Sequence, residues 1–302
     1  MLASELKYRC EFIYTERKLP APFRYLVQAM RTWSVIRNGK YSQVVVMLPP
    51  LPALLCVLAA GQSRMSVVGD LHTGFFLNPK WKWMSGLGLW LLRGGRAIVT
   101  NGALAEICAR RGVDAIVLHD VLKKPEYADI EDRPRQKVNS PIILCPLAYA
   151  NDEPIESIIE AAGLLPDVRF IFTGNAPSWI RDRAPHNIDF SGYVSNTEYW
   201  ELLASCSGVL ALTVRDFTMQ RAGYEAMLAG KPHVTSDFAT LRQFYGDSAV
   251  YTLSEGVDIA SAIREMLQHS SRLIDSAATV LAHRSTEQRE ALTVLAGING
   301  NA

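Results

Sequence analysis

The sequence predicts an α/β protein with two doubly wound, parallel-sheet domains that face each other across a cleft. Short β-branched runs alternate with segments of helical periodicity along almost all of the 302 residues. The predicted strands are continuously apolar, which is typical of parallel strands buried on both faces. Repetition of strand, helix and strand builds such a sheet, with helices on both sides. A highly charged segment at mid-chain indicates two sheets rather than one.

The N-terminal domain is expected to span residues 1–122. Its strands are predicted at residues 10–14, 44–48, 66–70, 96–100 and 115–118. A helix lies between the first two of them, and its apolar face consists of Phe23, Leu26, Val27, Met30 and Ser34. Gly39 is the predicted C-cap of this helix.

Residues 123–140 are predicted to form the interdomain linker, because half of them are charged. The C-terminal domain then spans residues 141–275, and a helix over residues 276–302 is expected to pack back towards the N-terminal domain. Its strands are predicted at residues 142–145, 168–174, 187–190, 208–213, 233–236 and 249–253. Ser195 and Glu198 have the spacing of a capping box and predict a helix start.

The composition argues against several classes of protein. The formal net charge of +1 gives no basic footprint for nucleic acid. The most apolar run, residues 44–60, contains three prolines and is too interrupted for a membrane span. The first residues show no signal-peptide pattern, and the five cysteines form no CxxC pair. We therefore expect a cytoplasmic protein.

Residues 215–237 contain the main candidate ligand site. The strand before them ends in a short loop, after which Thr218 is predicted to cap a helix whose first backbone N–H groups bind an anion. Glu225 follows seven residues later on the same helical face, where its carboxylate can accept hydrogen bonds from a vicinal diol such as ribose. This pairing would suit a nucleoside diphosphate. The alternative is an ordinary i,i+4 ion pair between Glu225 and Arg221 on a solvated face.

The stretch "RDFTMQRAGYEAMLAGKPHVTSD", residues 215–237, resembles the donor-binding segment of the retaining glycosyltransferases of family 4 (group 1), which have the GT-B fold. That family commonly shows two glutamates with seven residues between them, followed by A-x-x-x-G-x-P. The second glutamate matches Glu225, followed by Ala226, Gly230 and Pro232. The resemblance implies a GT-B protein with two Rossmann-like domains.

The first glutamate of the family pattern is replaced by Phe217. In the family this glutamate lies near the donor sugar and diphosphate. The resemblance therefore implies that its role is moved to Asp216 or taken by backbone groups around Phe217 and Thr218.

Further donor contacts follow from the resemblance. Relatives supply Arg or Lys from the loop after the first strand of the C-terminal domain, but residues 146–154 contain no cation. Neutralisation of the diphosphate is then expected from Arg215, Arg221 or Lys231, together with the helix start. The loops that hold the nucleobase in relatives suggest Gly174, Asn175 and Tyr193. The implied donor-binding residues are Glu225, Thr218, Phe217, Met219, Gln220, Arg215, Arg221, Gly174, Asn175 and Tyr193.

Asp70 and His72 are the candidate catalytic residues of the N-terminal domain. A predicted strand ends at Asp70, and a histidine in the loop just beyond it lies at the ligand-binding edge of such a sheet. Gly74 is the predicted tight-turn residue of this loop. A lone histidine is more often structural than functional, but the resemblance implies that His72 contacts the donor sugar near the reacting centre. Asp216 completes the candidate catalytic set.

The start of the chain departs from the family pattern. GT-B N-terminal domains begin with a strand and a glycine-bearing loop that lines the acceptor site, whereas this chain begins near the second strand, at residues 10–14. Loss of a central first strand would leave buried backbone groups unpaired. Three explanations stay open: Met1 is not the natural start, the sheet is rearranged, or the chain is a degraded copy.

A basic and aromatic segment suits contact with a membrane surface. Lys80 and Lys82 alternate with Trp81 and Trp83, a composition that favours anionic bilayers, where lipid-linked acceptors reside. A core helix with cationic ends is an equally consistent alternative.

Together these features predict a glycosyltransferase that moves a sugar from a nucleotide diphosphate donor to a saccharide or lipid-linked acceptor, in polysaccharide or glycolipid synthesis. Retention of stereochemistry is implied by the resemblance. No Asp-x-Asp motif occurs, so no metal or other cofactor is expected. One alternative is a non-catalytic nucleotide-sugar-binding or partner subunit, supported by Phe217 and the cation-free loop. Another is a sugar-nucleotide epimerase of the same fold, which would need acid and base groups converging on the sugar.

Overall fold

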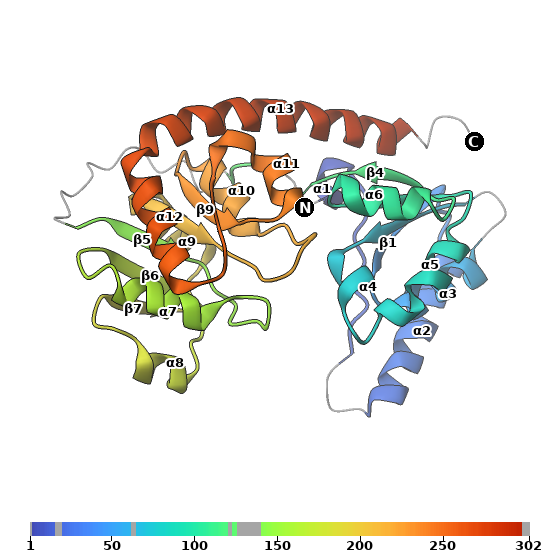
Figure 1. The fold of residues 1–302 in the computed structure, drawn as a ribbon. Coiled ribbons are helices and arrows are strands. Elements are labelled where there is room, and N and C mark those ends of the chain that lie inside the picture. The colour runs from blue at the N-terminus through green and yellow to red at the C-terminus, as the bar shows by residue number, and fades with distance from the viewer. Residues whose placement is uncertain (1, 16–19, 62–64, 120–122, 126–139, 298–302) are drawn as a thin grey trace. The chain divides into compact units, whose positions relative to one another are not determined.

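The structure is a computed structural model that describes residues 2–15, 20–61, 65–119, 123–125 and 140–297 (Figure 1). The chain divides into two compact units. Unit 1 comprises Met1–Val121 with Glu287–Ala302, and unit 2 comprises Leu122–Thr286. Most of the predicted linker, residues 126–139, lies outside the described residues.

Unit 1 contains a parallel four-stranded sheet with the order β1-β2-β3-β4. Its strands are β1 (Gln43–Leu48), β2 (Ser66–Leu71), β3 (Arg96–Val99) and β4 (Asp114–Val117). Its helices are α1 (Leu2–Glu5), α2 (Ala21–Asn38), α3 (Leu51–Ala60), α4 (Thr73–Leu77), η1 (Lys82–Met84), α5 (Ser85–Leu91) and α6 (Gly102–Ala109). Four of the five strands predicted for this half of the chain are confirmed.

The core of unit 1 combines its sheet with the end of the last helix, α13 (Ser270–Gly297). Val68 and Ile98 of the sheet are buried in one cluster with Ala291 and Leu295 of α13. The sheet and residues about two hundred positions later in the sequence therefore share one hydrophobic core.

One of the strands predicted for unit 1 is absent. Residues 10–14 are not a strand, and Phe12 and Tyr14 are exposed. A segment with aromatic and β-branched residues becomes a strand only where a neighbouring strand completes its backbone hydrogen bonds. The segment is instead held beside its ends by side chains, because the Tyr8 hydroxyl donates to Gln43 and Gln28 donates to Thr15.

The helix predicted between these strands forms as α2, and its predicted apolar face is exposed at Phe23, Leu26 and Met30. The periodicity identified the helix correctly, but it does not reveal what covers the apolar face. Gly39 does end the helix, in extended rather than left-handed backbone.

Unit 2 contains a parallel six-stranded sheet with the order β10-β9-β8-β5-β6-β7. Its strands are β5 (Ile142–Cys145), β6 (Arg169–Thr173), β7 (Ile188–Gly192), β8 (Gly208–Ala211), β9 (His233–Ser236) and β10 (Val250–Thr252). Its helices are α7 (Ile155–Gly163), α8 (Ser178–Arg183), α9 (Asn196–Ser205), α10 (Arg221–Leu228), α11 (Ala239–Tyr245), η3 (Gly246–Ser248) and α12 (Gly256–Gln268). The strand order reverses between β5 and β8, which makes this sheet doubly wound.

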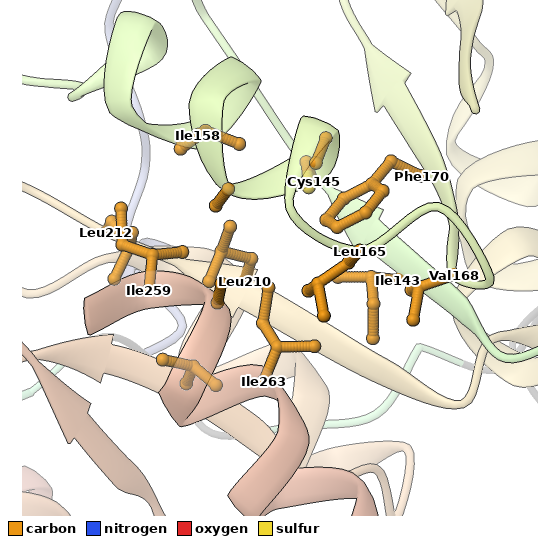
Figure 2. Packing of buried hydrophobic residues seen from close by; sticks show 14 of the residues in the cluster. Ile143, Cys145, Ile158, Leu165, Val168, Phe170, Leu210, Leu212, Ile259 and Ile263 are labelled. Atoms are coloured by element: carbon orange, nitrogen blue, oxygen red, sulfur yellow. The ribbon is translucent and has the colours of Figure 1, made fainter. Parts of the chain in front are cut away.

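Helices cover both faces of the unit 2 sheet. Ile143 of β5 packs with Ile158 of α7 and Ile263 of α12 on one face (Figure 2). Leu144, the next residue, packs on the other face with Trp200 of α9. Burial on both faces explains the continuously apolar strands, and each buried aliphatic side chain contributes about 1.5–3 kcal/mol. The predicted capping box of Ser195 and Glu198 is present at the start of α9.

Within the described ranges, no helix is both long enough and apolar enough to span a bilayer.

Candidate functional site

The reversal of strand order in unit 2 brings together the segments that follow β5 and β8. Adjacent strands at such a point continue to opposite faces of the sheet, and ligands of doubly wound sheets bind beside it. The two segments are joined here, because the Val214 amide donates to the Asp152 carbonyl oxygen over 2.7 Å. An Arg215 guanidinium nitrogen also lies 3.9 Å from an Asp152 carboxylate oxygen. This edge of the sheet is the candidate site of unit 2.

The loop after β8 has a constrained backbone. Phe217 has φ of 60°, in the left-handed region that is uncommon for a bulky residue. One carboxylate oxygen of Asp216 accepts from the Phe217 amide over 2.7 Å and from the Thr240 hydroxyl over 3.4 Å. The carboxylate of Asp216 therefore holds the loop in place, a use that sequence reasoning did not foresee.

The helix of this site begins at Arg221, so the prediction that Thr218 caps it is wrong. Gln220 is the N-cap residue, and its side-chain amide donates to the Leu212 carbonyl oxygen over 2.9 Å. Met219 packs against a hydrophobic cluster that includes Leu241. With Phe217 left-handed and Met219 anchored in this way, residues 217–220 form a loop rather than the first turn of the helix. The N-cap of α10, and with it the anion-binding end of the helix, lies two residues later than predicted.

Glu225 lies one turn into α10 rather than two. Its side chain is only 12% exposed, whereas its partner Arg221 is 76% exposed. The Nε atom of Arg221 donates to one carboxylate oxygen of Glu225 over 2.7 Å. The i,i+4 ion pair that was the alternative is thus present, but on a face that is largely covered.

Tyr199 of α9 covers the carboxylate from the neighbouring helix. Burial first, and then the negative charge of Glu225, raise the pKa of the Tyr199 hydroxyl far above its usual range. The phenol therefore stays protonated beside the carboxylate at any physiological pH. Tyr199 was not predicted, because nothing in the sequence places α9 next to α10.

The loop after β6 approaches the loop after β5. Gly174 has φ of 80°, and a Cβ atom there would lie 2.2 Å from the Leu147 carbonyl oxygen. Asn175 and Tyr193, the other two predicted nucleobase residues, are exposed. Gly174 is therefore required by the local backbone, whether or not a ligand binds beside it.

Tyr149, in the loop after β5, is a site residue that sequence reasoning missed. It has φ of 56°, and its ring lies next to Gly174. Its hydroxyl is buried and has no hydrogen-bond partner among the described residues. Burial chiefly raises the pKa of this hydroxyl to about 12. The left-handed backbone could not be expected from a tyrosine.

Lys231 is not available to an anionic ligand, contrary to prediction. It is buried, and its ammonium group donates to the carbonyl oxygens of Ala204 and Cys206 at the end of α9. A cation at the C-terminal end of a helix is stabilised by the helix dipole. Arg215 and Arg221 are the predicted cations that remain exposed.

In unit 1, Asp70 is the fifth of the six residues of β2, and His72 follows the end of that strand. A ring nitrogen of His72, Nε2, lies 3.4 Å from an Asp70 carboxylate oxygen, and the imidazole is half exposed. The His72 amide donates to the Leu48 carbonyl oxygen, which fixes the turn out of the sheet. Gly74 is not a tight-turn residue, because it lies inside α4. That His72 and Glu225 line one cleft stays a prediction.

The comparisons with known proteins agree with this architecture. Residues 140–269 match the sequence model of the family described as Glycosyl transferases group 1. No curated protein matches the chain in sequence. The matched residues contain both loops of the candidate site in unit 2.

Solved structures share the fold at low sequence identity. Anabaena HepE, in complex with UDP and glucose, is 16% identical, with 97% of this chain and 88% of that chain covered and a TM-score of 0.70. The alpha,alpha-trehalose-phosphate synthase (UDP-forming) from Burkholderia vietnamiensis is 13% identical, with 95% and 81% covered and a TM-score of 0.68. A glycosyltransferase from Rickettsia africae ESF-5 is 12% identical, with 99% and 87% covered and a TM-score of 0.70. The predicted GT-B fold, with two Rossmann-like domains, is confirmed.

Proposed function

We propose that this chain is a glycosyltransferase that moves a sugar from a nucleoside diphosphate donor to a saccharide or lipid-linked acceptor. The observation that supports this proposal most is Glu225, a nearly buried carboxylate one turn into α10, within the residues that match the group 1 family. UDP and UDP-glucose are the first donor ligands to test, because HepE structures contain them. The proposal extends to retention of configuration, to polysaccharide or glycolipid synthesis, and to a place in the cytoplasm.

The donor would bind along α10, with its ribose at Glu225 and its diphosphate at the start of the helix. Glu225 has one carboxylate oxygen paired with Arg221, and it can accept hydrogen bonds from the two hydroxyl groups of a ribose. The diphosphate would lie at the start of α10, where backbone N–H groups and the helix dipole favour negative charge. Arg215 and Arg221 are exposed at this end and supply the cations that the loop after β5 lacks.

Catalysis would depend on stabilising the departing diphosphate rather than on an acid–base pair in unit 2. The charge that develops on the leaving group is offset by the helix start and the two arginines. Asp216 is engaged in holding the loop, so its proposed role is to position the backbone around Phe217. His72, oriented by Asp70, would contact the sugar from unit 1. We propose no metal ion or other cofactor for this step.

The second candidate function is a non-catalytic nucleotide-sugar-binding subunit. Phe217 favours it, since an apolar side chain in strained backbone stands where the family has an acid. Donor turnover distinguishes the two functions, because only the enzyme consumes the donor.

The experiment compares Glu225→Gln with a matched control. Thermal stabilisation by UDP, GDP, ADP and UDP-glucose is measured for the native protein, for E225Q and for E265Q, which alters an exposed glutamate of α12 in the same unit. Loss of charged hydrogen bonds to ribose is expected to weaken nucleotide binding about 10- to 100-fold in E225Q, with E265Q unchanged. Equal binding by E225Q would contradict the role of ribose anchor.

Turnover is measured in parallel as donor hydrolysis and as transfer to saccharide acceptors. His72→Ala is expected to slow turnover while UDP affinity is kept, and proton NMR of the product reports the anomeric configuration. If the native protein binds nucleotide but shows no turnover, the transferase proposal is refuted in favour of a non-catalytic nucleotide-sugar-binding subunit. Loss of turnover on chelation of metals would refute metal independence.

A further inference from the structure

Helix α2 exposes a row of large apolar side chains. Phe23, Leu26, Met30 and Trp33 are between 49% and 60% exposed. Their spacing places them on one face of the helix, and we call these four residues the α2 patch. Isolated exposed apolar residues are ordinary, but a row along three turns of a helix marks an interaction surface.

The predicted basic and aromatic segment adjoins the N-terminal part of α2. The Lys80 ammonium donates to the Tyr25 hydroxyl of α2 over 2.9 Å and lies 5.0 Å from the centre of the Trp81 ring. The Trp83 indole nitrogen donates to the Lys80 carbonyl oxygen, while the Trp83 side chain is 75% exposed. This exposure is inconsistent with the alternative in which Trp83 belongs to a core helix. A second element with exposed aromatic and basic side chains therefore lies beside α2, next to Tyr25.

Positive charge predominates in the part of the sequence that contains α2 and Trp83. From Arg17 to Ala105 the sequence contains eleven lysines and arginines and a single acidic residue, Asp70. Arg31 and Arg37 of α2 and Lys82 beside Trp83 are exposed. Yet the whole chain carries a formal charge of only +1, so positive charge is concentrated in the part of the chain that carries the patch.

We propose that the α2 patch and Trp83 dock unit 1 onto the surface of an anionic lipid bilayer. Apolar and aromatic side chains would enter the interface, while the exposed lysines and arginines pair with anionic headgroups. A second copy of the chain fits this surface less well, because a symmetric contact would bring two excesses of positive charge together. An acidic protein would also match the charge, and the test below distinguishes it from a bilayer.

This surface goes beyond the proposed transferase activity, since lipid binding requires neither donor nor turnover. Failure of one proposal therefore leaves the other intact: vesicle binding and nucleotide-dependent thermal stabilisation are measured separately on the same protein.

The test is cosedimentation of the whole 302-residue chain with vesicles. One set contains equal parts of phosphatidylglycerol and phosphatidylcholine, and the other contains phosphatidylcholine alone. The variants are Leu26→Glu with Met30→Glu, and Lys80→Gln with Lys82→Gln. The control is Val257→Glu, which changes an apolar residue that is 64% exposed in unit 2. Circular dichroism verifies that each variant is folded.

Native protein and V257E are expected to bind the anionic vesicles, and added salt should weaken the binding. Each double variant should reduce that binding by at least about tenfold, since both apolar insertion and headgroup charge contribute. The proposal is overturned if anionic and neutral vesicles bind equally, or if the L26E and M30E pair leaves binding unchanged. If the protein is a dimer, and the L26E and M30E double variant dissociates it without affecting vesicle binding, the α2 patch binds a second copy of the chain instead of a bilayer. Capture of an acidic protein without any vesicle binding would also overturn it.

Discussion

His233 is expected to make unit 2 sensitive to acid. It lies on β9 with no exposed surface, and neither ring nitrogen has a hydrogen-bond partner in the described part of the chain. Its ring packs edge-on against Tyr245, with 4.6 Å between ring centres. Burial without a partner penalises the imidazolium and lowers the pKa of His233 to about 4, from 6.5.

The sign follows from which state holds the proton. Between pH 6.5 and about 4 the unfolded chain is protonated at His233 while the folded chain is not, so protons favour unfolding. The free energy of unfolding that depends on neutral His233 is fully present above pH 6.5 and is lost as the pH falls towards 4. Applying about 1.4 kcal/mol per pKa unit, this residue should remove about 2 kcal/mol of stability between pH 7 and pH 5.

The assay is urea unfolding at pH 7 and pH 5 for the native protein, His233→Leu and His186→Gln. Leucine is apolar and of similar volume, and His186 is an exposed histidine of the same unit. H233L should lose about 2 kcal/mol less than the native protein between the two pH values, because contributions from other groups cancel in the comparison. H186Q should behave like the native protein. Equal losses in H233L and the native protein would refute the reasoning.

Two further predictions concern the backbone of unit 2. Asn187→Ala should lower the free energy of unfolding in urea by about 3 kcal/mol. The reason is that the side-chain amide of Asn187 donates to the buried carbonyl oxygens of Ala162, Leu165 and Val168. A loss no larger than that caused by Asn151→Ala, at an exposed asparagine, would contradict this. Gly174→Ala should cost about 2 kcal/mol or more, since alanine is disfavoured at its φ of 80° and its methyl group would meet the Leu147 carbonyl oxygen. Gly163→Ala, in open helical surroundings, should be neutral or stabilising in the same thermal unfolding experiment, and similar behaviour of both alanines would disprove the steric argument.

The sequence by itself determined the order and type of nearly all elements. Strands buried on both faces require continuous apolar runs, so ten of the eleven predicted strands exist. Local chemistry was equally readable where it depends on near neighbours, as in the capping box of Ser195 and Glu198. The resemblance found in residues 215–237 was local too, and it lies within the matched family segment.

Only the tertiary structure decided what each element contacts. Residues 10–14 have the composition of a strand but form none, because a strand is defined by its partner. The apolar stripe of α2 predicted a helix correctly, yet periodicity does not reveal whether a core or another surface covers the stripe. Thr218 is not the N-cap of α10, because Phe217 adopts a left-handed backbone conformation and Met219 packs against a core cluster. The neighbours of Glu225 show the same difference. The ion pair with Arg221 could be predicted from the i,i+4 spacing. The proximity of Tyr199 could not, because it depends on how α9 packs beside α10.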